Sequence, residues 1–178
     1  MSSGDFTLLD EIVDAAAHGL FETVGLPLGQ VREASGRNLQ DDDVASSIGF
    51  TAPTLHGAVT LVTRRDIVAR SWPAELGKPS ERDVCDWAGE LVNQLLGRVK
   101  NALVTRGVAL DQSTPTVVVG RQVHRSPAST TVARTFIYDV SGGGTIQLYF
   151  DAVVAEAFSL SPSAEGDPPA AEGALRLF

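Results

Sequence analysis

One long helix constrains the fold of this chain more than any other segment. Ser80 can cap this helix at its N-terminus, and Asp83 then occupies the carboxylate position of a capping box. The helical pattern continues to about Arg106, where Gly107 can end it. This is the longest element that the sequence predicts, and the rest of the fold has to cover its apolar side.

At helical periodicity, the residues of this segment separate onto two faces. The apolar face is predicted to contact the core and consists of Val84, Ala88, Leu91, Leu95, Val99 and Ala102. The opposite face carries a polar stripe, which consists of Asp86, Glu90, Asn93, Gly97 and Lys100. Glycine inside a helix costs about 1 kcal/mol relative to alanine, so Gly97 indicates that something approaches the helix backbone closely.

Glu90 and Asn93 are the candidate catalytic residues of the polar stripe. A carboxylate and a carboxamide side by side on one helical face can orient a water molecule or bind a charged partner, but neither is a strong nucleophile. The pair therefore favours a surface that acts on another macromolecule. Geometry alone leaves a second interpretation open, in which the stripe is an ordinary solvated face with a tolerated glycine.

The segments on either side of the long helix alternate between helix and strand patterns. Apolar spacing predicts a first helix over residues 6–24, and residues 64–72 can form one short helix. Strand patterns occupy residues 44–50, 55–62, 116–119, 129–140 and 145–154. Ser141-Gly142-Gly143-Gly144 predicts a hairpin turn and not a phosphate cradle, because it lies between two strands instead of between a strand and a helix.

These elements predict an α/β (α+β) fold in a single domain. Its mixed or mostly antiparallel sheet has five or six strands and packs against two long helices, the first and the third. The domain is assigned to residues 1–158, and the Ser-, Pro- and Ala-rich residues 159–178 to a flexible tail. The polar residues 29–43 are expected to form a loop.

The charge of the chain excludes some classes of partner. Fourteen Lys and Arg residues against 22 Asp and Glu residues give a formal net charge of −8. This charge argues against broad electrostatic attraction to nucleic acid or to an anionic membrane, and it suits a partner with a basic rim.

The remaining composition suggests a cytoplasmic protein without a metal site of its own. Cys85 is the single cysteine, so no internal disulfide can form, and the start of the chain lacks the pattern of a secretory signal. The longest uncharged stretch, residues 44–63, would make a poor membrane span. His18, His56 and His124 are isolated from other ligand residues, so no metal site is expected.

Several of these segments together resemble a known family. Glu90-Leu91-Val92-Asn93, followed by Gly97, Lys100, Leu103, Gly107 and residues 113–120, resembles the CheX branch of the CheC/CheX/FliY chemotaxis phosphatases. Residues 47–51 and 57–61 are similar to the strand pair before the helix in that family, and the first helix is similar to its N-terminal helix. The resemblance spans about residues 5–155, judged by the order of the elements.

This resemblance implies a function and a set of site residues. In that family a Glu-x-x-Asn pair on an exposed helix dephosphorylates a CheY-type response regulator. Those roles would fall on Glu90 and Asn93, with Asn93 orienting the attacking water and Glu90 anchoring the partner. Asp86, Gly97 and Lys100 would contact the partner. Magnesium would belong to the response regulator, this chain would bind no cofactor, and a homodimer is expected.

One departure from the family pattern limits the number of active centres. The CheC branch carries two copies of the Glu-x-x-Asn motif, whereas the first helix here reads Glu11-Ile12-Val13-Asp14. An aspartate cannot donate a hydrogen bond to a phosphoryl oxygen at neutral pH and would repel it. The sequence therefore predicts one active centre, on the long helix, and assigns the first helix to packing and solvated surface.

Two other functions remain open from the sequence. The chain could be a module that binds a receiver domain without turnover, because a motif can persist after its activity has gone. It could also be a structural component related to the flagellar-switch members of the wider family.

Overall fold

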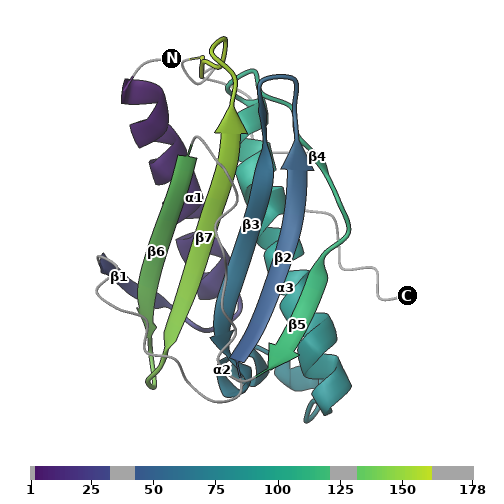
Figure 1. The fold of residues 1–178 in the computed structure, drawn as a ribbon. Helices are drawn as coiled ribbons and strands as arrows, with labels where there is room; N and C mark the ends of the chain where they lie inside the picture. Colours follow the sequence, from purple (N-terminus) through teal and green to yellow (C-terminus); the bar gives the residue numbers. More distant parts are fainter. Residues whose placement is uncertain (1–2, 33–42, 121–131, 162–178) are drawn as a thin grey trace.

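A single open sheet with helices on one face forms the body of the protein. The structure, a computed structural model, describes residues 3–32, 43–120 and 132–161. Within these residues one seven-stranded antiparallel sheet has the order β1-β6-β7-β3-β2-β4, and β5 pairs with β2 beside β4 (Figure 1). The strands are β1 (Leu28–Arg32), β2 (Asp43–Thr51), β3 (Leu55–Arg64), β4 (Asp111–Gln112), β5 (Thr116–Gly120), β6 (Val132–Val140) and β7 (Thr145–Val154).

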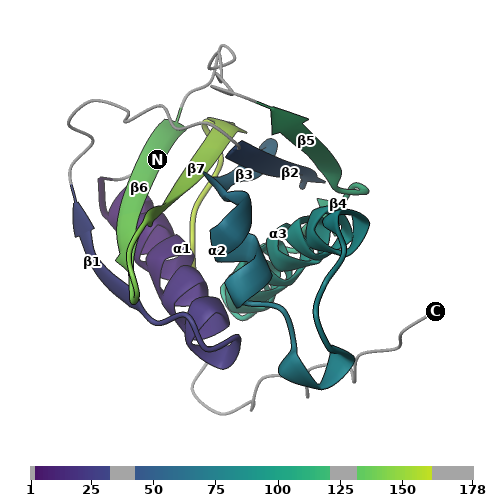
Figure 2. The same ribbon diagram turned by 90° about the horizontal axis from the view of Figure 1, so that it is seen from below.

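The helices all cover the same face of this sheet. Figure 2 shows α1 (Ser3–Thr23) beneath β6 and β7, and α3 (Glu81–Val104) beneath β2 and β5, with the short α2 (Arg65–Arg70) between them. A 3₁₀ turn, η1 (Ala74–Leu76), lies between α2 and α3 in the chain. The core lies between the two layers, because alternate side chains of the central strands point toward the helices. Its largest fully buried side chains include Tyr138, Phe150, Leu20, Leu95 and Ile48.

Most of the predicted elements are confirmed. The first helix, the β2–β3 hairpin, the short α2 and the long α3 all form within a few residues of their predicted bounds. The strand predicted over residues 129–140 is β6, which begins at Val132; residues 129–131 lie outside the described residues, as do residues 162–178 of the predicted tail. Of the tail's first residues, Leu160 packs against the core and its backbone N–H donates to Asp5 Oδ1 (3.2 Å).

Two strands were not predicted, so the expected total of five or six strands was wrong. β1 forms inside the segment that was expected to be a loop, where Val31 and Arg32 pair with Tyr138 and Ile137 of β6. β4 has only two residues and pairs with the end of β2. Both strands lie at an edge of the sheet and form by pairing with segments distant in sequence. Neither carries the local alternating pattern from which a strand can be predicted.

Helix α3 has more buried positions than its predicted apolar face contains. The prediction is confirmed: Val84, Ala88, Leu91, Leu95 and Val99 are buried, and Ala102 is partly buried and packs against the core. Further buried positions of this helix are Trp87, Gly89, Val92, Leu96 and Leu103. The reason is that α3 packs against the sheet on one side and against α1 on another, and contacts α2 near its own start, where Trp87 Nε1 donates to Ser71 Oγ (2.9 Å).

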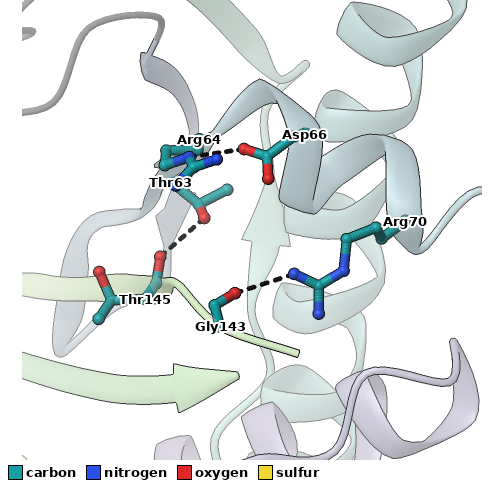
Figure 3. Close-up of polar contacts among 6 residues, drawn as sticks. All are labelled: Thr63, Arg64, Asp66, Arg70, Gly143 and Thr145. Carbon is teal, nitrogen blue, oxygen red and sulfur yellow. Dashed lines mark hydrogen bonds and ion pairs between the residues drawn. The ribbon is translucent and has the colours of Figure 1, made fainter. Parts of the chain in front are cut away.

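The predicted glycine turn between β6 and β7 is confirmed and is attached to α2. Gly142, Gly143 and Gly144 all have positive φ angles of 81°, 91° and 97°. As Figure 3 shows, the guanidinium of Arg70 donates to the carbonyl oxygen of Gly143 (2.9 Å); it also donates to that of Ser141. The turn therefore connects two strands, as predicted, and is attached to α2 through Arg70.

Candidate functional site

The capping box predicted at the start of α3 sets where the candidate helix begins. Ser80 Oγ accepts from the backbone N–H of Asp83 (3.2 Å), and the Asp83 carboxylate accepts from the backbone N–H of Ser80 (2.8 Å). The hydrogen bonds from the Ser80 side chain and backbone lower the pKa of Asp83 below its usual value. The register of every later residue of α3 follows from this fixed start.

Both predicted catalytic side chains lie at the surface of α3, and each is held by a glutamine. Glu90 and Asn93 are half-exposed. Gln94 Nε2 donates to Glu90 Oε1 (2.9 Å), one helical turn away. Gln112 Nε2, from β4, donates to Asn93 Oδ1 (2.9 Å). The carboxylate and the carboxamide are therefore oriented by neighbours while part of each remains accessible.

The other predicted residues of the polar stripe follow the same side of α3. Asp86 is exposed, with its carboxylate 3.7 Å from Arg82 Nε, and this exposed ion pair contributes little to stability. Gly97 and Lys100 are half-exposed. Every residue of the polar stripe is thus at least partly exposed.

The close approach to α3 occurs at Gly89 and not at Gly97. A Cβ atom added at Gly89 would lie 3.4 Å from Val117 Cγ2 and 3.9 Å from Pro115 Cβ, so β5 and its preceding segment pack on this glycine. At Gly97, apart from the two chain neighbours and the nearby backbone of α3 itself, no described atom lies within 4 Å of such a Cβ. The expectation that Gly97 marks a close approach is therefore not met within the described part of the chain, and this position is an open notch in the stripe.

Asp14 of α1, which stands where the motif of α3 has Asn93, contributes to packing. Asp14 Oδ1 accepts from the hydroxyl of Tyr138 (2.8 Å), whose side chain is fully buried. Burial raises the pKa of Tyr138, and the hydrogen bond and negative charge of Asp14 raise it further, so the phenol stays protonated and donates. The Asp14 carboxylate thus connects α1 to β6.

Gly89 and Gln112 belong to the candidate site on α3 but were not predicted from the sequence. Gln112 lies 19 residues beyond Asn93, in a strand too short to carry a pattern. The one usable signal is Gly107, whose positive φ of 83° turns the chain back after α3 and so brings the next residues beside the helix.

The described residues contain neither a cluster of metal ligands nor a membrane-spanning helix. In residues 3–32, 43–120 and 132–161, no group of three or more His, Cys, Asp or Glu side chains is placed to hold a metal ion. No helix in the same ranges combines the length and apolar character that crossing a membrane requires.

Fold and site together define a class of protein. It is a one-domain antiparallel sheet with two long helices on one face, in which the longer helix presents a carboxylate and a carboxamide at its surface. A family model described as "Chemotaxis phosphatase CheX" matches residues 44–138, which is more than half of the chain and includes Glu90, Asn93 and Gln112. The chain belongs to this family of chemotaxis phosphatases. No curated protein matches the sequence.

Solved structures share the fold at low sequence identity. The chemotaxis protein CheX from Vibrio vulnificus is 19% identical with a TM-score of 0.68, and the match covers 81% of this chain and 95% of that chain. CheX from Borrelia burgdorferi, solved in a complex with CheY, BeF₃ and Mg²⁺, is 13% identical with a TM-score of 0.63, covering 80% and 96%. The FliM middle domain from H. pylori is 12% identical with a TM-score of 0.56, covering 85% and 94%.

Proposed function

We propose that this chain hydrolyses the aspartyl-phosphate of a CheY-type response regulator. The observation that carries the proposal is the Asn93 carboxamide, which is half-exposed on α3 and oriented by Gln112 within a chain of the CheX family. The complex of Borrelia CheX with CheY supports a receiver domain as the partner class.

The chemistry of the substrate matches what this surface offers. An aspartyl-phosphate is an acyl phosphate that hydrolyses slowly without help, so a catalyst needs only to place a water molecule in line with the phosphorus and hold it there. The Asn93 carboxamide can form a hydrogen bond with this water, and its amino group is the end that does not contact Gln112. No nucleophile on this chain is required.

Glu90 is assigned to binding the partner. A carboxylate beside a phosphoryl group would be repelled, whereas an ion pair with a lysine of the receiver domain would fix the docking register. Asp86 and Lys100 would add contacts along the polar stripe, and the open notch at Gly97 would let the partner approach the helix backbone. The magnesium ion would be bound by the receiver domain and not by this chain.

The same proposal includes a homodimer formed through sheet edges. The outer strand β5 leaves Val118 51% exposed and Val119 37% exposed, which suits pairing with a second copy. The proposed activity also implies a cytoplasmic location, because the receiver domain would be met there.

The direct test of the proposed function is the lifetime of a phosphorylated receiver domain. A panel of candidate receivers would be phosphorylated, and phosphate loss would be followed with and without a small molar fraction of this chain. We expect repeated turnover on at least one receiver. Unchanged lifetimes on receivers that do bind the chain would contradict the phosphatase function.

A second candidate function is a structural or receiver-binding module without turnover. The likeness to the FliM middle domain favours this alternative on fold alone. It predicts equal affinity for phosphorylated and unphosphorylated receiver, or stable incorporation into a large assembly. A monomer or dimer in sizing experiments, together with turnover, would exclude it.

Glu90→Ala tests the anchoring role. We expect the receiver concentration at half-saturation to rise about tenfold, with a smaller effect on the rate at saturation, because the lost contact is one ion pair of the docked complex. Glu90→Gln removes the charge while keeping the shape of the side chain and serves as the matched variant. A large fall in the saturated rate with unchanged half-saturation would instead place Glu90 in the chemical step.

Asp14→Asn tests the prediction of one active centre. The substitution creates a Glu-x-x-Asn pattern on α1 with Glu11. An amide at position 14 can still accept the hydrogen bond from the Tyr138 hydroxyl, so the side chain should stay where Asp14 is. In an Asn93→Ala background we therefore expect no recovery of receiver dephosphorylation, measured as phosphate release. Recovered turnover would show that α1 can act as a second centre.

A further inference from the structure

Gln112 lies in β4, at the edge of the sheet, where this edge meets α3. Its side-chain nitrogen donates to Asn93 Oδ1 at 2.9 Å, and this contact joins β4 to α3. Gln112 itself is exposed, so the hydrogen bond lies at the protein surface, where a docked partner would meet Asn93.

The backbone around Gln112 is fixed on both sides. Asp111 and Gln112 pair with Thr51 and Phe50 of β2. The next residue, Ser113, donates its backbone N–H to the carbonyl oxygen of Gly49 (2.9 Å), and its Oγ accepts from the Gly49 N–H (2.9 Å). A two-residue strand held in this way has little freedom to move away from α3.

The preceding residues bring β4 alongside the helix. Gly107, with its positive φ, reverses the chain after α3, and Val108 and Leu110 are then buried in the core. Gln112 follows two residues after Leu110, so its position relative to Asn93 is set by core packing as well as by the strand pairing.

The direction of the hydrogen bond determines which end of the Asn93 carboxamide faces a partner. Because Oδ1 accepts from Gln112, the Nδ2 amino group lies on the other side of the carboxamide. Rotating the Asn93 carboxamide alone by a half-turn would bring two amino groups together and lose the bond, which would re-form only if the Gln112 amide turned as well. In this structure the hydrogen bond thus holds the Asn93 carboxamide in one orientation in the absence of a partner.

We propose that Gln112 is a positioning residue, which holds the Asn93 carboxamide with its amino group toward the phosphoryl group and the attacking water of the partner. Gln112 acts only through Asn93, so the inference rests on the proposed phosphatase function. Gln112 touches neither the water nor the phosphate and is not itself a catalytic residue.

Three variants test this role, with phosphorylated receiver as substrate. Gln112→Leu removes the donor, and we expect the rate at saturation to fall about threefold to tenfold with unchanged half-saturation, as for one lost orienting hydrogen bond. Gln112→Glu replaces the donor by a carboxylate that can only accept, so a bond to Asn93 would require the reversed carboxamide, and the rate at saturation should fall further than for Gln112→Leu. Asp111→Ala, in the same strand but on the other face of the sheet, should leave the rate unchanged.

Three measurements separate positioning from a general structural effect. The melting temperatures of the Gln112 variants should match that of the unmodified chain, and the ¹⁵N side-chain amide signal of Asn93 should shift in both. In an Asn93→Ala background, Gln112→Leu should cause no further loss, because both residues act through one group.

The outcomes also separate this inference from the proposed function. If Asn93→Ala abolishes dephosphorylation while Gln112→Leu leaves the saturated rate and the Asn93 amide signal unchanged, the positioning role is overturned and the proposed function stands. If the unmodified chain does not shorten the phosphate lifetime of a receiver that it binds, both are overturned.

Discussion

Replacing Gly57 by alanine is expected to destabilise the protein strongly, in contrast to the same replacement at Gly97. A Cβ at this position would lie 1.9 Å from the carbonyl oxygen of Asp151 and 2.8 Å from the Cα of Ala152, and both are backbone atoms of β7. Gly57 pairs with Ala152 in the centre of the sheet, so the two strands would have to separate. We expect a loss on the order of 3 kcal/mol in the free energy of unfolding.

A second glycine provides the matched control for this prediction. Gly97 lies in the interior of α3, and no described atom beyond its chain neighbours and the nearby helix backbone lies within 4 Å of a Cβ added there. Gly97→Ala should therefore stabilise the helix, by up to about 1 kcal/mol. Chemical denaturation of both variants measures the contrast, and a Gly57→Ala protein as stable as the original would contradict the backbone geometry of β3 and β7.

Replacing Asn93 by alanine is expected to reduce receiver dephosphorylation by about 100-fold at saturation, the size of effect that follows when a group that positions a reactant is lost. The half-saturating concentration should change little, because the anchoring contacts of Glu90 remain. Stability should also change little, since Asn93 is half-exposed and its hydrogen bond to Gln112 lies at the surface.

The control for Asn93 is an exposed carboxamide far from the site. Gln30 lies in β1, at the margin of the sheet opposite β5, and is exposed. Gln30→Ala should retain the full steady-state rate of phosphate release. Equal losses in the Asn93 and Gln30 variants would indicate a general effect of substitution and would remove the support for Asn93 as the catalytic amide.

The sequence predicted those elements whose pattern is local. The long helix α3 could be located because the Ser80 and Asp83 capping box, the apolar period and Gly107 are all contained in one segment. The β6–β7 hairpin could be located because three consecutive glycines separate two runs of strand-forming residues. Its attachment to Arg70 could not, because α2 is distant from the turn in sequence.

The features that could not be predicted depend on contacts between distant segments. Strand β1 forms because β6 supplies a partner, and β4 forms because core packing of Val108 and Leu110 brings the chain back beside β2. The same limit applies to the helix glycines. Composition could not distinguish Gly89, on which β5 packs, from Gly97, which lies open.

The candidate site shows the same division. Residues of the polar stripe could be assigned to one face from helical spacing alone, and the family resemblance then selected Glu90 and Asn93 from them. Gln112 could not be found in this way, because its relation to Asn93 exists only after the chain has turned at Gly107 and paired with β2.

A single-turnover experiment tests the central claim most directly. Phosphorylated receiver domain would be mixed with an excess of this chain that saturates binding, and the loss of the aspartyl-phosphate would be followed for the unmodified protein and for Asn93→Ala. We predict that the unmodified chain accelerates hydrolysis well above the spontaneous rate, whereas saturating Asn93→Ala leaves the rate close to the spontaneous one. Equal acceleration by both proteins would contradict the assignment of Asn93 as the residue that orients the attacking water.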